Sequence, residues 1–209
     1  MSDVVDILKK IGAVITDDHF VYTSGKHGEV YINKDALYPH TKETSEVCRL
    51  MAEKYKDEKV DVVVGPALGG IILSQWVAYH LTEMKGKEVL GVYTAKDESG
   101  NQVFDRRGYD KLVKNKKVLV VEDLTTTGGS VKKSVDSVKA AEGEVIGVCV
   151  MVNRDPEGVT SETVGAPFTA VGVLKAEAFD ETECPFCKEN RPINTNIGHG
   201  KEYLEKKKK

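Results

Sequence analysis

Two adjacent acids, followed by a loop rich in hydroxyls and glycine, are the part of the sequence best suited to chemistry. An apolar run at residues 118–121 leads into Glu122 and Asp123, and a Thr- and Gly-rich loop then continues to Ser130. Free backbone N–H groups, hydroxyls and the start of a helix form a cradle for an anion such as phosphate. Carboxylates repel phosphate, so the two acids suit sugar hydroxyls, or a metal ion held indirectly.

Short apolar runs alternate with helical patterns around this loop. Strands are expected at residues 60–64, 88–94, 117–121, 144–152 and 168–173, and helices at 41–55, 71–84 and 130–141. This order is typical of crossover units, so we predict one α/β domain with a mostly parallel sheet flanked by helices. Ligands of such sheets bind at the carboxyl ends of the strands, where both acids lie.

The N-terminal part is expected to form a smaller piece packed on this sheet. A helix capped by Ser2 and ended by Gly12 is predicted first, followed by extended segments at residues 19–23 and 30–33. We expect residues 1–40 to contribute a hood to the single domain at 1–209.

Three other segments are expected to lie near the same ligand site at the carboxyl edge of the sheet. A glycine-rich turn at residues 65–70 follows one strand, and Arg154 follows another. Residues 96–116 are polar and lack apolar periodicity, so they are predicted to be a long loop, and such loops are usually functional. Taken alone, the turn could be structural and Arg154 could be a surface ion-pair partner.

The strand, the two acids and the Thr/Gly loop resemble the signature of the type I phosphoribosyltransferases. A nucleotide-binding P-loop is excluded because its Gly-Lys-Ser/Thr spacing is absent. Four further stretches are similar to the orotate phosphoribosyltransferases: residues 22–34, the turn at 65–71, residues 153–155, and the segment from Cys184 to Pro192.

This resemblance implies a role for each matching residue. Glu122, Asp123, Lys96, Arg106 and Arg107 would be catalytic, acting on the ribose and on pyrophosphate. The 5′-phosphate of phosphoribosyl pyrophosphate (PRPP) would be held by Thr125, Thr126, Thr127, Gly128, Gly129 and Ser130. The pyrophosphate loop would be Ala67, Leu68, Gly69 and Gly70, and orotate would contact Arg154, Thr126, Lys34 and Tyr31.

The implied reaction joins orotate to PRPP, giving orotidine 5′-monophosphate and pyrophosphate in pyrimidine nucleotide biosynthesis. Mg²⁺ bound through PRPP is the expected cofactor, without a dense set of protein ligands, and a homodimer is the expected assembly. Residues 96–116 would form a lid, although Ala95 and Ser99 replace an Arg and a Lys that many members carry there. The pair Arg106–Arg107, later in the same segment, resembles an Arg-Arg pair found in another branch of the family.

Two other functions were weighed against this one: a phosphoribosyltransferase for a purine or another base, and a non-catalytic PRPP-sensing regulator. The chain has 209 residues and a net charge of −3, and its tail at 201–209 carries five Lys and two Glu. The rest of the chain therefore has a net charge of −6, and an acidic protein is poorly suited to bind the phosphates of a nucleic acid. No apolar run is long enough for a membrane span, and the acidic start is unlike a secretory signal. A cytoplasmic protein with a frayed basic tail is expected.

The four cysteines are too few and scattered for a disulfide framework. Cys184 and Cys187 are compatible with a plain structural role, with a zinc site that has His199 as a third ligand, or with a redox dithiol. A structural role is favoured, because Cys48 and Cys149 lie too far away in the sequence to complete four zinc ligands. His27 is expected to approach the active site from the hood, and His40 and His80 to be surface or packing residues.

Overall fold

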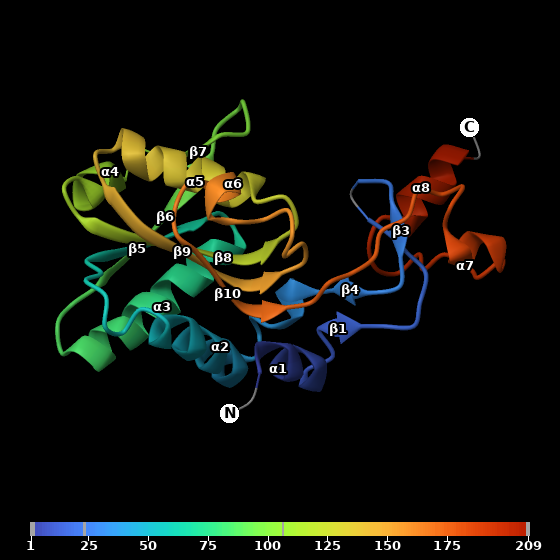
Figure 1. The fold of residues 1–209 in the computed structure, drawn as a ribbon, viewed down its shortest axis with the longest axis horizontal. Coiled ribbons are helices and arrows are strands. Elements are labelled where there is room, and N and C mark those ends of the chain that lie inside the picture. The colour runs from blue at the N-terminus through green and yellow to red at the C-terminus, as the bar shows by residue number, and fades with distance from the viewer. Residues whose placement is uncertain (1–2, 23, 106, 208–209) are drawn as a thin grey trace.

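A six-stranded sheet forms the centre of the protein, which is described from a computed structural model over residues 3–22, 24–105 and 107–207 (Figure 1). Its strands are β5 (Val62–Pro66), β6 (Leu90–Lys96), β7 (Gln102–Val103), β8 (Lys117–Thr125), β9 (Glu144–Asn153) and β10 (Phe168–Val173). The spatial order is β10-β9-β8-β5-β6-β7. All neighbours pair in parallel except β7, which runs antiparallel to β6 at the edge.

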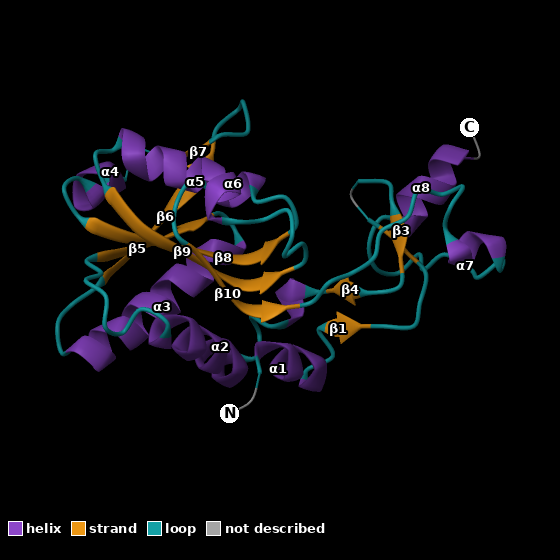
Figure 2. Ribbon diagram, viewed as in Figure 1, coloured by secondary structure: helices purple, strands orange, loops and turns teal. Residues whose placement is uncertain are grey.

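Helices cover both faces of this sheet (Figure 2). On one face lie α1 (Val4–Lys10), α2 (Thr41–Glu53) and α3 (Gly69–Lys85); on the other lie α4 (Tyr109–Val113), α5 (Gly129–Ala140) and α6 (Ser161–Val164). Successive residues of a strand point to opposite faces. In β8, Leu119 and Val121 join the first core, whereas Val118 and Val120 join the second. The expected parallel sheet flanked by helices is confirmed.

The two ends of the chain meet in a smaller lobe, which we call the hood and define as residues 16–33 and 175–207. Figure 1 shows its blue and red segments side by side, away from the sheet. Its elements are β2 (Phe20–Val21), β3 (His27–Gly28), β4 (Tyr31–Ile32), α7 (Pro185–Lys188) and α8 (Gly200–Lys207). β2 pairs with β3, and β4 pairs with β1 (Val14–Ile15), which leads into the hood. A short 3₁₀ helix, η1 (Lys34–Ala36), leads out of it.

Several sequence predictions about these elements need correction. Residues 96–116 are not one long loop, because they contain β7 and α4. The tail is helical as far as Lys207, and Tyr203 of α8 packs edge-on against His27. The hood is not confined to residues 1–40: α1 packs against β9, β10 and α2, and the C-terminal segment supplies the rest of the lobe.

The first helix begins one residue later than expected, since Asp3 caps it through a bond from the N–H of Val5. Ser2 lies outside the described residues. Among the helices of the described ranges, none has both the length and the apolar character needed to cross a membrane.

Candidate active site

The side chains of Glu122 and Asp123 leave the end of β8 on opposite faces of the sheet. Strand alternation sends Glu122 to the side of α5, where Ser130 is a hydrogen-bond partner, and Asp123 to the side of α3. Both residues are nearly inaccessible, with exposed fractions of 6% and 4%. The strand thus presents one carboxylate to each flank of the same cleft.

Asp123 is held by contacts from its own strand and from the turn of chain that contains Lys34 and Tyr38. Tyr38 donates its hydroxyl hydrogen to Oδ2 at 2.7 Å, and the Lys34 ammonium lies 3.0 Å from the same oxygen. Oδ1 accepts the N–H of Leu124 at 2.6 Å. A Cβ built on Gly69 would lie 1.8 Å from Oδ2, so only glycine allows this approach of α3 to the acid.

These contacts shift the acid–base behaviour of the neighbouring groups. Burial, and then the negative charge of Asp123, raise the pKa of Tyr38 far above its usual range, so its hydroxyl stays a donor. Burial acts to lower the pKa of Lys34, but the Asp123 and Asp35 carboxylates outweigh it and raise that pKa. The lysine therefore remains a cation beside the acid.

Glu122 is in a different electrostatic environment. Its burial and the nearby charge of Asp123 raise the pKa of its carboxyl group. The N–H of Asp123 donates to Oε1 at 3.1 Å and partly offsets this rise. Glu122 consequently holds a proton more readily than an exposed glutamate does.

A cleft of about 550 Å³ opens over the two acids. Its lining residues are Lys34, Ala67, Leu68, Gly69, Lys96, Glu122, Asp123, Leu124 and Ser130. It brings together members of all four predicted groups: the catalytic acids with Lys96, the turn at residues 67–69, Ser130 of the phosphate-binding loop, and Lys34 of the orotate contacts. Gly70 lies behind this lining, where a Cβ would be 2.6 Å from the Pro66 ring.

The loop after Asp123 has the form of an anion cradle. The hydroxyl of Thr125 accepts the N–H of Gly128 at 3.0 Å, which closes the loop on itself. Gly128 has a φ of +73°, a conformation that favours glycine, and α5 begins at the next residue. Thr126 and Thr127 are exposed to solvent, and the chain continues from them into the N-terminus of α5. The N-terminus of a helix attracts anions such as phosphate.

A smaller cleft of about 160 Å³ adjoins the first and shares Lys34 and Leu124 with it. Its lining residues are Tyr22, Tyr31, Ile32, Asn33, Lys34, Asp35, Leu124, Arg154 and His199. Three of the four predicted orotate contacts, Arg154, Lys34 and Tyr31, therefore lie in one place. The fourth, Thr126, lines neither of these two clefts.

Arg154 is positioned by the hood as well as by the sheet. Its backbone N–H donates to the carbonyl of Thr125 at 2.9 Å, so it directly follows the end of β9 beside the phosphate loop. Its guanidinium stacks on the Tyr22 ring at 4.8 Å. The Nε atom is buried and has no hydrogen-bond partner among the described residues, so a donor remains available to an anionic ligand.

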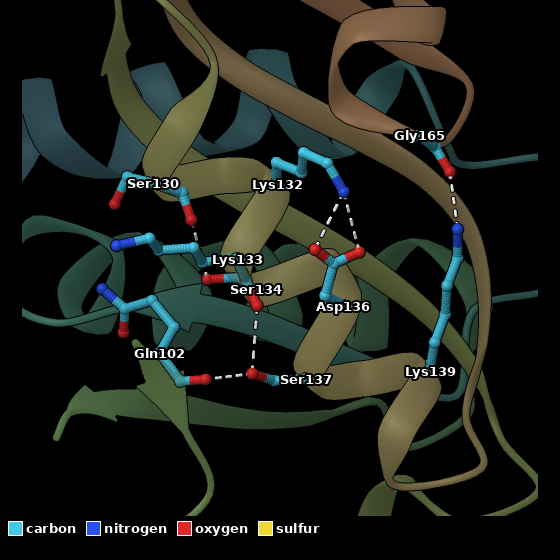
Figure 3. Close-up of polar contacts among 9 residues, drawn as sticks. All are labelled: Gln102, Ser130, Lys132, Lys133, Ser134, Asp136, Ser137, Lys139 and Gly165. Carbon is cyan, nitrogen blue, oxygen red and sulfur yellow. Dashed lines mark hydrogen bonds and ion pairs between the residues drawn. The ribbon is translucent and has the colours of Figure 1, made fainter. Parts of the chain in front are cut away.

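The hairpin that carries Lys96 is tied to α5. Inside it, Thr94 donates to the side-chain oxygen of Gln102 at 2.9 Å. Figure 3 shows Ser137 of α5 donating to the backbone carbonyl of Gln102. Lys133 donates to the carbonyl of Gly100 at 2.7 Å. The base of the expected lid is therefore anchored beside the phosphate loop.

Of the two arginines predicted to act with Lys96, Arg107 is described and does not line the larger cleft. Arg107 stacks on Tyr93 at 5.3 Å and pairs with Asp105. Arg106 lies outside the described residues. Their predicted contact with pyrophosphate stays a prediction.

Sequence reasoning missed three residues of this site: Tyr38, Tyr22 as the partner of Arg154, and His199 as part of the smaller cleft. It was wrong about His27, which is fully buried in the hood beside His19 and does not line either cleft. Tyr22 belongs to a stretch already singled out, but nothing in the sequence around Tyr38 marks it.

Comparison with known proteins agrees with this geometry. Residues 33–163 match the model of the phosphoribosyl transferase domain family. The orotate phosphoribosyltransferase of Thermoanaerobacter sp. (strain X514) is 38% identical over 92% of this chain and 94% of its own.

Solved structures show the same likeness. The orotate phosphoribosyltransferase of Aeropyrum pernix superposes with a TM-score of 0.63 at 28% identity, over 82% of this chain and 93% of its own. The orotate phosphoribosyltransferase of Mycobacterium tuberculosis, solved in complex with PRPP, superposes with a TM-score of 0.61 at 25% identity. This match covers 83% of this chain and 97% of the other. The cradle after β8, the paired acids and these likenesses together place the chain in the phosphoribosyltransferase family, as a member of its orotate phosphoribosyltransferases.

Proposed function

We propose that this chain transfers the phosphoribosyl group of PRPP to orotate, with PRPP in the larger cleft and orotate in the smaller one. In this reaction the C1–O bond of PRPP breaks and its electron pair leaves with pyrophosphate. N1 of orotate bonds to C1 and loses its proton, which passes to pyrophosphate or to water. The observation that carries the proposal is the adjacency of the two clefts: they share Lys34 and Leu124, so two substrates bound in them would meet at one point.

The two acids are proposed to hold the ribose. Glu122 and Asp123 lie at the floor of the larger cleft, and carboxylates are strong acceptors for sugar hydroxyls. Because they point to opposite flanks, they can engage the 2- and 3-hydroxyls of one ring from two sides. This orients C1 toward the smaller cleft, and positioning of this kind supplies much of the rate in group transfer.

The two phosphate-bearing ends of PRPP would lie on either side of the acids. The loop from Thr125 to Ser130, with the N-terminus of α5, suits the 5′-phosphate. The turn at residues 67–70 and the Lys96 ammonium border the same cleft and suit pyrophosphate. Negative charge grows on pyrophosphate as the bond breaks, so a cation there favours the transition state over the ground state.

Arg154 is proposed to select orotate. Its guanidinium lies in the smaller cleft with an unpartnered Nε, and a guanidinium pairs with a carboxylate through two parallel hydrogen bonds. Lys34 adds a second cation at the boundary between the clefts. A purine has no carboxylate to place against these groups, which favours orotate over the purine alternative.

Mg²⁺ fits this arrangement as a partner of PRPP. The cleft offers two carboxylates, and Mg²⁺ commonly binds one or two carboxylates together with substrate oxygens and water. Glu122 and Asp123 would hold the ion through the ribose hydroxyls or through water. When bound, it would neutralise charge on pyrophosphate.

A homodimer in the cytoplasm is also part of the proposal. Ile72, Trp76 and Tyr79 share one side of α3, where Ile72 and Tyr79 are exposed, and such an apolar face suits a second copy of the chain. All four cysteines are free thiols, as expected in a reducing compartment.

A direct assay tests the proposed reaction. Purified protein with PRPP and Mg²⁺ should consume orotate and form orotidine 5′-monophosphate and pyrophosphate, and it should not consume adenine or uracil at a comparable rate. Asp123→Asn should abolish most of this turnover, whereas Asp136→Asn, on the exposed side of α5, should not. Turnover of adenine with none of orotate would reverse the assignment of the base.

A further inference from the structure

Two histidines and two cysteines converge in the hood, outside both clefts. They are His19, His27, Cys184 and Cys187, and their ligand atoms all lie within 4.8 Å of one another. His19 directly precedes β2 and His27 lies in β3, whereas Cys184 caps α7 and Cys187 lies within it. His19, His27 and Cys184 are fully buried, and Cys187 is partly exposed.

The distances between these atoms are close to those around one tetrahedral zinc ion. Zn–N bonds near 2.0 Å and Zn–S bonds near 2.3 Å place neighbouring ligand atoms about 3.3–3.8 Å apart. Nε2 of His19 lies 3.7 Å from the sulfur of Cys184 and 3.8 Å from that of Cys187. Nδ1 of His27 lies 3.3 Å from the sulfur of Cys187 and 2.8 Å from Nε2 of His19. Of these four pairs, only the last must separate, by about 0.5 Å. The other two pairs, His27–Cys184 and Cys184–Cys187, lie within 4.8 Å.

The hydrogen bonding of His19 fixes its ring for this role. Its Nδ1 lies 2.9 Å from the backbone carbonyl of Arg191, and a carbonyl can only accept, so Nδ1 carries the proton. In the neutral ring, Nε2 then carries the lone pair, and it lies near the two sulfurs and His27. A ligand histidine whose other nitrogen donates to a backbone carbonyl is the common arrangement around protein-bound zinc.

A cross-link would support the hood, because its apolar core is small: Phe20, Val21, Tyr22 and Phe186 are buried, and Ile32 is the hood residue that joins the main core among those described. Neither of the two hydrophobic clusters includes any described residue of 16–31 or 175–207. Segments too small to bury a sufficient core are commonly held by disulfides or metal ions. Here one ion would join the N-terminal strands to a C-terminal segment more than 150 residues away.

We propose that His19 Nε2, His27 Nδ1, Cys184 Sγ and Cys187 Sγ bind a structural zinc ion that holds the hood together. The four protein ligands complete a tetrahedron and leave no position for substrate, so the ion is structural and not catalytic. Binding releases the two thiol protons and involves no change of oxidation state. This corrects the earlier ligand prediction: His199 pairs with Glu202 and lines the smaller cleft, and the missing ligands are His19 and His27.

The ion would also support the orotate cleft. Tyr22, which stacks on Arg154, lies three residues after His19, and its backbone bonds to Lys26 beside His27. The N–H of His199 donates to the carbonyl of Val21. Two lining residues of the smaller cleft are thus attached to the zinc-bound strands.

Metal content tests the proposal without any use of activity. Protein purified in reducing buffer, without a polyhistidine tag, should contain one zinc ion per chain by elemental mass spectrometry. Cys187→Ser should weaken zinc binding by about 100-fold or more. Cys48→Ala, which removes a buried thiol in the main core, should retain a full equivalent. Replacement of zinc by Co²⁺ should give the thiolate charge-transfer absorption and tetrahedral d–d bands.

Hydrogen exchange of the wild-type protein provides a second readout if the variant fails to fold. Removal of zinc by a chelator should speed exchange at the hood amides of Tyr22 and His27, and leave those of β8 and β9 protected. Wild-type protein that contains no zinc and shows no Co²⁺ charge-transfer band would overturn the proposal. A Cys184–Cys187 disulfide in the reduced preparation would do so as well. Failure of the orotate assay in zinc-loaded protein would contradict only the proposed reaction.

Discussion

The ammonium of Lys34 lies 3.0 Å from Oδ2 of Asp123, which ties the end of the hood to the acid at the end of β8. Tyr38 donates to the same oxygen, so a buried carboxylate is met by one cation and one hydroxyl from a single turn of chain. The same lysine borders both clefts. Lys34 is therefore placed to respond to PRPP and to orotate together.

Loss of that cation should weaken the fold as well as the reaction. Lys34→Met leaves Asp123 nearly buried and without its counter-ion, and we expect about 1–3 kcal/mol of lost stability, reduced by the partial exposure of Lys34. Urea unfolding measures this. Lys175→Met is the matched control, because Lys175 and Glu157 form a solvent-exposed pair that contributes little to stability. Equal effects of the two variants would contradict a special role for Lys34.

The pH dependence of stability should report on Glu122. Because its pKa is raised in the folded state, the folded protein binds that proton more tightly than the unfolded chain. The stabilisation is complete below the unfolded pKa and is lost as the pH rises through the folded pKa. Glu122→Gln mimics the protonated acid, so its Tm should fall less than that of the wild type between pH 5 and 9. Parallel curves for the two proteins would exclude this role of Glu122.

Gly69→Ala adds a single methyl group, but it should lower the activity of the site strongly. The added Cβ would lie 1.8 Å from Oδ2 of Asp123 and 2.5 Å from the Tyr38 hydroxyl, so both side chains must move. We expect kcat/KM to fall by at least about tenfold, because the displacement affects groups in contact with substrate. Steady-state kinetics with PRPP measure the effect. Unchanged kinetics would mean that Asp123 need not hold its observed position.

When PRPP binds, the expected lid should close over the larger cleft by movement of short segments only, and the sheet should not change. The base of the hairpin is anchored by Thr94, Gln102 and Ser137. Residues 97–101, which the long side chain of Lys133 contacts at Gly100, and residues 107–109 are therefore the parts expected to respond. Addition of PRPP with Mg²⁺ should slow hydrogen exchange in these two segments, while β8 and β9 remain unchanged. Exchange that is unchanged in both segments would contradict a lid at this position.

Much of the site could be predicted because its signals are local in sequence. An apolar strand that ends in Glu122 and Asp123 and runs into a glycine loop specifies its own place at the carboxyl end of a parallel sheet. The same reasoning placed Arg154 correctly after β9. Strand alternation also explains, from residue parity alone, why the two acids face different flanks.

The rest depended on contacts between distant parts of the chain. The hood is built from both termini, so its histidines and cysteines meet across 160 or more residues, and spacing alone could not pair them. Tyr38 reaches Asp123 across 85 residues. The sequence of residues 96–116 does not reveal β7 and α4, because these elements have only two and five residues. Elements this short do not show a repeating pattern of apolar residues.

The selectivity of Arg154 is the most direct test of the account. We predict that Arg154→Ala lowers kcat/KM for orotate by about 100-fold or more, since it removes one member of the charge pair proposed to form with orotate in the smaller cleft. Arg49→Ala, on the surface of α2, should leave the kinetics unchanged.

Isothermal titration of PRPP into Arg154→Ala, compared with steady-state kinetics in orotate, is the decisive measurement. The account predicts PRPP affinity within about threefold of wild type together with the large loss for orotate, because the PRPP contacts lie in the other cleft. Equal losses for both substrates, or no loss for orotate, would contradict it.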